Sequence, residues 1–430
     1  MPKLIHTIRS STFLRHNAIF FFGALAAGAL NYLFYPIMAR LLSTDSFGEV
    51  QTLVSLFTQI NIFLNVLGLL TVNIVVNNPP GEKRDRLILE IEKLALVAGL
   101  VLVVVSFLAG KSLEHFFHFS TYWPFVGLSG AVFVTVPLLF RSAYLRGQRA
   151  FGVVAVLNVA AAGADLVLSV ALALFHWKTT GVMAGLLLAQ LLTCIYAALL
   201  ARRSGFKGSH AHTLLRLPDM RMITPELNYA MVVLASSLII TGMYSVDTIV
   251  VKHWFDAYTA GLYAGIATIA RIIFFVTASI AQVLLPSVHM SQTGKHNRAI
   301  LMKSFVLLMA IGGSVLLVFC LAPRTVVEVL MGGRFVPYAN LLPRLSLVIF
   351  LVSVINLFML YHLALRRYAI AVIAVVGAGA TAVIMLLHHQ TPQLVVDDLL
   401  YGCIITGGLL GGWALRTKKE AVLIPDRVDA

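Results

Sequence analysis

Long apolar segments recur along this chain, and short polar turns separate them. Each is long enough to cross the roughly 30 Å hydrocarbon core of a bilayer as an α-helix. They cover residues 18–38, 50–76, 91–109, 122–140, 153–175, 181–201, 228–251, 259–285, 302–322, 341–364, 369–387 and 395–415. Barrel strands are shorter and alternate apolar with polar residues, a pattern that these segments lack. We therefore expect an all-α polytopic membrane protein with about 12 transmembrane helices.

The composition agrees with this pattern. Of the 430 residues, 59% are hydrophobic and 12% are charged. Soluble domains carry roughly 25% charged residues. The chain is therefore too poor in charge for an ordinary soluble protein of this length.

A weak internal repeat divides the apolar segments into two sets. Residues 41–50 align without a gap with residues 254–263, an offset of 254 − 41 = 213, and both copies place a polar turn and a glycine before the next helix. Residues 144–150 have a second, similar match near residues 364–369. Equal order and spacing of the two matches indicate two related halves.

The longest loop lies between these halves and is rich in basic residues, glycine and proline. We expect an N-terminal six-helix lobe at residues 1–203, a cytoplasmic linker at 204–227, a C-terminal six-helix lobe at 228–415 and a cytoplasmic tail at 416–430. Because six is even, both lobes enter the membrane from the same side. They should then face each other across a central cavity.

The net charge of +14 would suit a nucleic-acid partner, but the positions of the basic residues argue against one. With the N-terminus inside, 24 of the 32 Lys and Arg residues fall on inner segments and seven on outer turns. The positive-inside rule then predicts a multi-pass protein of the cytoplasmic (inner) membrane with both termini in the cytoplasm. On this interpretation the basic loops are topology anchors that lie against anionic membrane lipids.

The remaining basic residue, Arg271, lies inside an apolar segment, as does Asp247. Each charge costs roughly 2.5 to 3.5 kcal/mol at the middle of a spanning helix, so each needs a partner or a watery cavity. On antiparallel helices joined near Asp256, the two positions differ by six residues, roughly 9 Å along the axis. A direct ion pair and a water-lined substrate cavity are both compatible with this spacing.

Other polar residues in the spans are candidates for the same cavity. Asp165 lies about midway through the fifth span, and Asn31 and Gln59 lie in the first two. The amides could instead form hydrogen bonds between neighbouring helices. His pairs lack a third ligand, the three cysteines share no close spacing, and no Walker-type loop is present. We expect no metal site, no cofactor and no catalytic residue.

Three stretches resemble polysaccharide flippases of the multidrug/oligosaccharidyl-lipid/polysaccharide exporter (MOP) superfamily, and the likeness covers nearly the whole chain. Residues 31–42 (NYLFYPIMARLL) with 45–48 (DSFG) resemble the opening of these flippases. Asp247 followed by residues 261–264 (GLYA) is similar to the start of their second half. Residues 329–339 (VLMGGRFVPYA), followed by Leu345, resemble the turn before their tenth helix.

The resemblance implies a flippase of the O-antigen type that moves polyprenyl-pyrophosphate-linked saccharide units from the inner to the outer leaflet by alternating access. Arg271 would hold the pyrophosphate or an acidic sugar. The amides of Asn31 and Gln59 would contact sugar hydroxyls. Asp247 or Asp165 would take up the coupling ion, driven by about 2.3 kcal/mol per charge per 100 mV of membrane potential. A polysaccharide polymerase and glycosyltransferases are the expected partners besides the lipid-linked oligosaccharide, with no nucleic acid.

Two alternatives remain open. Drug and cation antiporters of the same superfamily often carry an acidic residue in the first helix, whereas residues 18–38 contain neither Asp nor Glu. A membrane-embedded polysaccharide polymerase or ligase would be expected to use a large outer loop, and the outer turns here are short. Lipid II flippases also resemble this chain but usually have two further helices.

Overall fold

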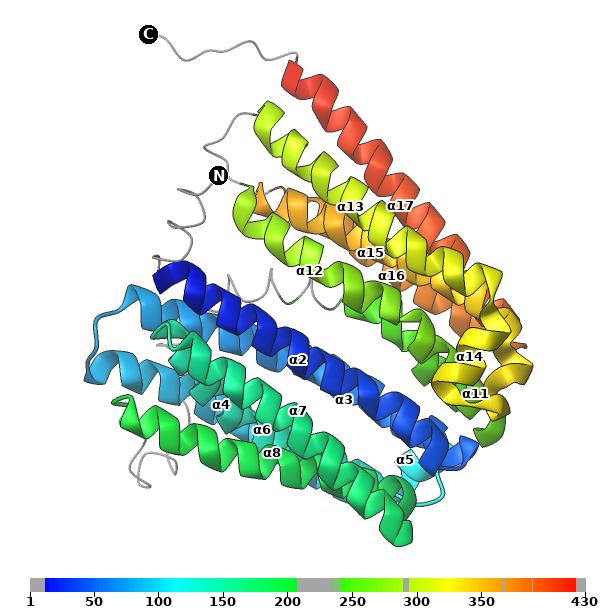
Figure 1. Cartoon of the computed structure of the whole chain (residues 1–430), viewed down its shortest axis with the longest axis horizontal. Helices are drawn as coiled ribbons and strands as arrows, with labels where there is room; N and C mark the ends of the chain where they lie inside the picture. The colour runs from blue at the N-terminus through cyan, green and yellow to red at the C-terminus, as the bar shows by residue number, and fades with distance from the viewer. Residues whose placement is uncertain are drawn as a thin grey trace. The chain divides into compact units, whose positions relative to one another are not determined.

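The computed structural model describes residues 12–206, 240–288, 294–365, 367, 369–388 and 390–422, together with the single positions 234 and 238 (Figure 1). Within these residues the chain forms helices and turns and no strand. The expected all-α class is confirmed. The chain divides into two compact units, Met1–Leu234 and Ala235–Ala430.

The described helices of unit 1 correspond to the first six predicted spans. They are α2 (Thr12–Leu41), α3 (Thr44–Asn77), α4 (Glu82–Leu108), the short α5 (Gly110–Phe116), α6 (Trp123–Gly147), α7 (Phe151–Leu172), the π-helical turn η1 (Ala173–Trp177) and α8 (Lys178–Arg203).

Unit 2 begins, in its described part, with a helix whose continuous portion covers residues 240–254. The others are α11 (Ala257–Ala270), α12 (Ile272–Ser287), α13 (Gly294–Leu321), α14 (Pro323–Met331), the 3-10 helix η2 (Gly333–Leu341), α15 (Leu342–Ala364), α16 (Ala369–Leu387) and α17 (Pro392–Val422).

Ten helices in the described residues are long and apolar enough to cross a membrane, and an eleventh apolar helix, Val372–Leu387, is shorter. The predicted seventh span, 228–251, lies only partly within the described residues, as does the predicted linker at 204–227. The lobe boundaries therefore stay a prediction. At the other end, α17 continues as helix to Val422, past the predicted start of the tail.

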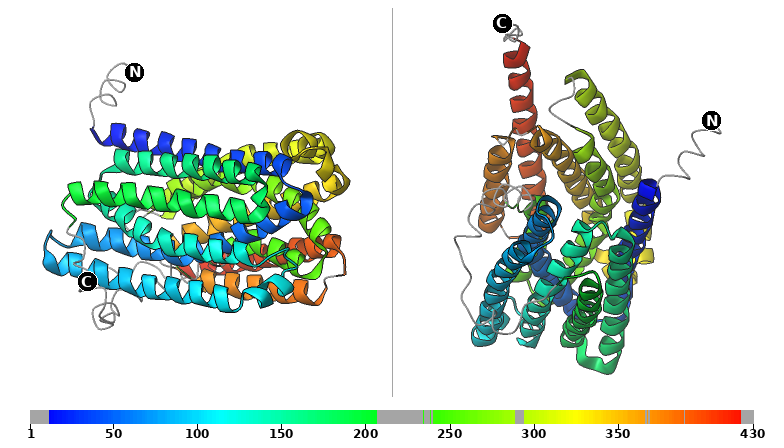
Figure 2. Two further views of the ribbon diagram at one scale, coloured as in Figure 1. Left: turned by 90° about the horizontal axis from the view of Figure 1, so that it is seen from below. Right: turned by 90° about the vertical axis from the view of Figure 1, so that its left-hand side faces the viewer.

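Within unit 1, α2 lies beside α7, and α6 packs against α3, α4 and α8 (Figure 2). A buried apolar cluster of α3, α4 and α6 includes Ile74, Ile91 and Phe140, and Phe206 joins it from beyond the end of α8. Within unit 2, α15 contacts α12, α13 and α17. Each unit thus has a core of its own.

Large apolar side chains cover the outside of both units, for example Phe22, Leu108, Phe175 and Leu321, which are between 64% and 78% exposed. Contiguous apolar surface of this kind marks contact with a membrane. Buried hydroxyls inside the units mostly bond to the carbonyl four residues earlier in their own helix, as Thr52 does to Gly48. The hydroxyls bonded in this way are therefore satisfied without water, as the bilayer requires.

The internal repeat recurs as the same helix cap in both units. Ser43 caps α3 with φ −64° and ψ 159°, and Asp256 caps α11 with φ −57° and ψ 157°. The Ser43 hydroxyl accepts the N–H of Ser46, and the Asp256 carboxylate accepts the N–H of Thr259. The pKa of Asp256 is lowered chiefly by that hydrogen bond. These residues are equivalent at the offset of 213, since 256 − 43 = 213.

The predicted outer turn between the third and fourth helices of each unit contains a short helix, α5 in unit 1 and α14 with η2 in unit 2. In unit 2, Phe335 of η2 is fully buried against Gly265 of α11. A Cβ atom at Gly265 would lie 2.5 Å from the Phe335 ring. The close contact between Phe335 and Gly265 holds the turn against α11.

Helices α16 and α17 pack through two reciprocal glycine–threonine contacts. A Cβ atom at Gly377 of α16 would overlap Thr406 of α17, and one at Gly402 of α17 would overlap Thr381 of α16. Small residues of this kind let membrane helices approach closely.

We predict opposite effects for two alanine substitutions in α17. Gly402→Ala should lower the stability of the detergent-purified protein by about 1–3 kcal/mol, because the added Cβ atom would overlap the Thr381 side chain. Gly408→Ala meets nothing within 4 Å and should raise it by up to about 1 kcal/mol through helix propensity. Thermal unfolding midpoints measure both, and equal shifts of the same sign would contradict the close packing.

Candidate functional site

Asp247 and Arg271 form a buried ion pair in unit 2. Nη2 of Arg271 lies 2.8 Å from Oδ1 of Asp247. Asp247 is 4% exposed and Arg271 7%. Of the two arrangements compatible with the sequence, the structure contains the direct pair.

Neighbouring residues form hydrogen bonds with both members of the ion pair. Arg271 donates from Nη2 to the Thr248 hydroxyl at 2.6 Å and from Nε to the Tyr244 carbonyl at 2.8 Å. Tyr263, which is fully buried, donates its hydroxyl to Oδ2 of Asp247 at 2.9 Å. The second terminal nitrogen of Arg271, Nη1, makes no hydrogen bond with the residues that the structure describes. Nη1 is therefore the one nitrogen of the group without a hydrogen-bond partner among the described residues.

The local fold explains how the two charges meet. The Asp256 cap ends the turn after helix 240–254 and starts α11, which runs back to Arg271 at its junction with α12. The helical hydrogen bonds continue across this junction, from Arg271 to Ala267 and from Phe275 to Arg271. Tyr244 and Phe274 stack with ring centroids 4.6 Å apart. This contact aligns the two helices, and the long Arg271 side chain closes the remaining gap.

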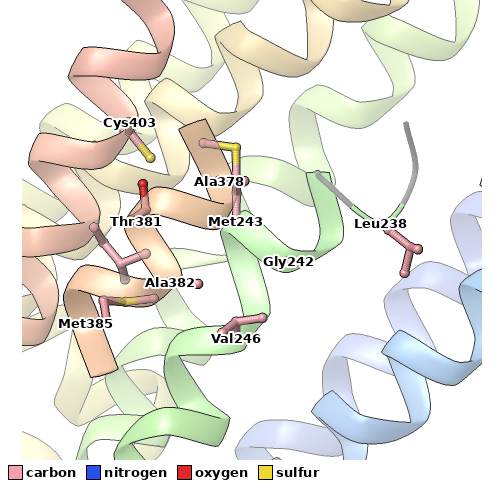
Figure 3. A pocket seen from close by; sticks show the side chains of 10 residues that line it. Leu238, Gly242, Met243, Val246, Ala378, Thr381, Ala382, Met385 and Cys403 are labelled. Carbon is pink, nitrogen blue, oxygen red and sulfur yellow. The ribbon is translucent and has the colours of Figure 1, made fainter. Parts of the chain in front are cut away.

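An apolar cavity of about 90 Å³ lies on the neighbouring face of helix 240–254, between it, α16 and α17 (Figure 3). Met243 and Val246 line it from this helix, Met385 from α16 and Cys403 from α17. Met243 lies one helical turn before Asp247, on the same side of the helix. The helix therefore presents the ion pair and the apolar cavity on adjacent faces.

The other predicted site residues belong to unit 1. Asp165 is partly buried in α7, and Oγ of Ser169 lies 3.1 Å from its Oδ1. It forms no ion pair with any described Arg, Lys or His. Asn31 is exposed on α2, and Gln59 is partly buried on α3. The structure thus joins Asp247 to Arg271 and leaves the roles of these three residues as predictions.

Charged pairs also lie inside unit 1, where the sequence analysis expected only topology anchors. Arg141 of α6 pairs with Glu92 of α4 at 2.6 Å, and Lys93 pairs with Glu90 at 2.9 Å. Arg141 also lies over the Phe206 ring, 4.7 Å from its centre. Lys93 and Arg141 are thus paired with buried carboxylates, and their role as topology anchors stays a prediction. The spacing of Glu90 and Lys93 on one helix face was the available signal.

Glu49, near the start of α3, is a second residue that the sequence analysis missed. It is 3% exposed and accepts hydrogen bonds from Ser120 and Thr179. The internal repeat offered a signal, because the chain has a glutamate at position 49 where the equivalent position in the second half is the apolar Leu262, at the offset 262 − 49 = 213. Among the described residues no group of three His, Cys, Asp or Glu side chains could hold a metal ion.

Solved structures with the same fold are membrane transporters. An inward-facing multidrug resistance MATE family transporter of the MOP superfamily matches with a TM-score of 0.70 and 15% identity, over 93% of this chain and 96% of that chain. The lipid II flippase MurJ, in an inward closed conformation, matches with a TM-score of 0.71 and 12% identity, over 92% and 86%. A MOP superfamily transporter from Pyrococcus furiosus matches with a TM-score of 0.58 and 15% identity, over 96% of both chains.

These matches define a multi-pass membrane protein with the MOP transporter fold. The model of the polysaccharide biosynthesis protein family matches residues 14–292, more than half of the chain. The chain therefore belongs to the polysaccharide biosynthesis protein family, and its fold is the one shared by these MOP superfamily structures. A search of curated proteins gave no significant match.

The ion pair predicts a specific pattern of stability. Arg271→Met leaves the Asp247 carboxylate buried without its cation. The substitution should lower the free energy of unfolding by about 3–5 kcal/mol. The double variant Asp247→Leu with Arg271→Met removes both charges and should recover most of that loss. Thermal unfolding of the purified protein in detergent measures the two values.

The control is the exposed pair of Arg344 and Asp397, in which Arg344 is 54% exposed. Arg344→Ala should change the stability by no more than about 1 kcal/mol. A double variant as unstable as Arg271→Met would show that the buried charges do not compensate each other.

Proposed function

We propose that this protein is a flippase that moves polyprenyl-pyrophosphate-linked saccharide units from the inner to the outer leaflet of the cytoplasmic membrane for surface polysaccharide synthesis. Membership of the polysaccharide biosynthesis protein family and the MOP fold support this proposal. Two six-helix lobes alternate in access around a central cavity, and both termini lie in the cytoplasm. The observation that carries the proposal furthest is the buried Arg271, whose Nη1 makes no hydrogen bond with the residues that the structure describes.

Arg271 binds the pyrophosphate in this scheme. A guanidinium group matches the spacing of phosphate oxygens and forms paired hydrogen bonds with them. Between transport events, Asp247 is the counter-ion at 2.8 Å. The pyrophosphate therefore competes with Asp247 for Arg271, and the freed Asp247 carboxylate takes up a proton or another cation. Substrate binding and ion binding are coupled because both involve the same salt bridge.

The apolar cavity beside helix 240–254 offers a place for the first part of the polyprenol chain. It lies one helical turn from Asp247 and is lined by apolar side chains, with Thr381 the polar exception. A lipid bound there would present its pyrophosphate toward Arg271. Most of the long chain remains in the bilayer.

The sugar and a second ion-binding carboxylate are assigned to unit 1. Asn31 and Gln59 contact sugar hydroxyls. Asp165 carries a proton across part of the membrane, because it is a carboxylate within a span and has no cationic partner among the described residues. Polymerase and glycosyltransferases act on either side of this step.

The proposal predicts the phenotype of a gene deletion. Complete polyprenol-linked saccharides should accumulate on the cytoplasmic side while surface polysaccharide disappears. Wild-type protein and Arg344→Ala should restore display, whereas Arg271→Lys should restore it poorly because Lys cannot form the paired contact. Lipid extraction and surface staining give both readouts.

The stable double variant Asp247→Leu with Arg271→Met separates folding from transport in this experiment. It should reach the membrane in normal amounts and still fail to restore display. Complete units that reach the outer leaflet without being polymerised would instead favour a polymerase or ligase. Unchanged lipids and surface polysaccharide would favour drug or cation export.

A further inference from the structure

One side of α3 carries a stripe of uncharged polar side chains, which we call the polar face. Gln51, Ser55, Thr58 and Asn65 follow one another at steps of four, three and seven residues, and Asn73 comes eight residues later. In an α-helix, steps of this size return to the same side. From Gln51 to Asn73 the stripe rises about 33 Å, which is enough to cross the hydrocarbon core of a bilayer.

The polar face carries no charge. Residues 50–81 contain no Asp, Glu, Lys, Arg or His. The internal repeat makes Thr58 the counterpart of Arg271, at the offset 271 − 58 = 213. A neutral hydroxyl in unit 1 therefore takes the position that the proposed phosphate-binding cation has in unit 2.

The polar face is covered at one end and open at the other. Gln51 is 1% exposed and Ser55 is 3% exposed, whereas Thr58 is partly buried and both Asn65 and Asn73 are exposed. On the predicted topology the covered end lies toward the outer side of the membrane. An amide exposed inside a span is costly against acyl chains, so we expect Asn65 to face water rather than lipid.

Polar groups along this face have hydrogen-bonding capacity to spare. Nε2 of Gln51 is buried and has no hydrogen-bond partner among the described residues. Asn61, which adjoins the polar face, donates from Nδ2 to the Phe57 carbonyl at 2.8 Å, and the Thr58 hydroxyl donates to the Val54 carbonyl at 2.8 Å. Both of these bonds stay within α3, so the side-chain oxygens of Asn61 and Thr58 can still accept a hydrogen bond from a ligand.

The chemistry of the polar face matches a saccharide. Sugar units carry hydroxyl groups that donate and accept hydrogen bonds, as amide and hydroxyl side chains do. One turn of α3 rises about 5.4 Å, which is close to the length of one sugar unit in a chain. An organic cation would favour a carboxylate or an aromatic ring, and the residues of the polar face include neither.

We propose that the polar face of α3 is the surface along which unit 1 binds the saccharide part of the substrate. Asn61 and Asn65 form hydrogen bonds with the first sugar hydroxyls that reach the open half. When the covered end opens, the sugar chain advances past Thr58 and Ser55, and a sugar oxygen accepts the hydrogen bond of Nε2 of Gln51. Each contact is exchanged for another of the same kind, so the saccharide stays hydrogen-bonded throughout the movement.

This inference rests on the proposed function and divides its substrate between the two units. Arg271 of unit 2 binds the pyrophosphate, and the polar face of unit 1 binds the sugars. Recognition of the sugar and recognition of the pyrophosphate should therefore respond to different substitutions.

The test compares the binding of two lipids to the purified full-length protein in nanodiscs, with dissociation constants measured by microscale thermophoresis. One lipid is the polyprenyl-pyrophosphate-linked saccharide extracted from the deletion strain, and the other is polyprenyl pyrophosphate without sugar. Asn61→Ala and Asn65→Ala should each weaken binding of the saccharide-linked lipid about fivefold, the effect of losing one hydrogen bond. Neither should change the affinity for the sugar-free lipid, whereas Arg271→Lys should weaken binding of both.

Phe63→Ala is the matched control. Phe63 lies between Asn61 and Asn65 in the sequence, on the opposite side of α3, and is 48% exposed. Its substitution should change neither dissociation constant.

The outcomes separate this inference from the proposed function. If Asn61→Ala and Asn65→Ala weaken binding of both lipids equally, or of neither, the saccharide role of α3 is wrong and the proposed function stands. If the wild-type protein binds neither lipid, or the deletion strain yields no saccharide-linked lipid, the proposed function is rejected and this inference with it.

A substitution at Gln51 separates saccharide binding from folding. Gln51→Met keeps a similar size and removes the buried donor that lacks a partner, so the thermal midpoint should rise by about 1–3 °C. Surface display in the deletion strain should nevertheless fall below the wild-type level, because the sugar loses its last hydrogen bond. Wild-type display by this variant would overturn the role of Gln51.

Discussion

Every charge and hydroxyl inside this protein must find a partner within the protein, because the surrounding hydrocarbon offers none. Many of the buried hydroxyls meet this constraint locally by bonding to their own helices. Two of the cations inside the units instead join helices to each other. Arg271 joins α11 and α12 to helix 240–254, and Arg141 joins α6 to α4. The arrangement of helices within each unit follows from these pairings as much as from apolar packing.

Much of the fold could be predicted from the sequence because the bilayer imposes a simple pattern on it. The apolar runs located the helices, and the repeat located equivalent caps at Ser43 and Asp256. The single helix expected over residues 259–285 is divided at Arg271 into α11 and α12. The helical hydrogen bonds nevertheless continue across this junction.

The candidate site was harder to predict, because an isolated charge indicates a site without naming its partner. Asp247 and Arg271 were visible as exceptions to the apolar pattern, yet their pairing depended on the reach of one side chain and on the Tyr244–Phe274 stack. Glu49 and Glu92 were overlooked because both lie near the ends of their spans, where acids and bases are common. Their importance comes from burial, which only the packed structure reveals.

The reciprocal glycine–threonine contacts of α16 and α17 limit how unit 2 can move. Gly377 and Thr381 are one turn apart, as are Gly402 and Thr406 on the antiparallel partner, so each threonine fits opposite a glycine in a single register. Sliding one helix by a turn would set threonine against threonine. A rearrangement that keeps these contacts therefore moves α16 and α17 together as one rigid body.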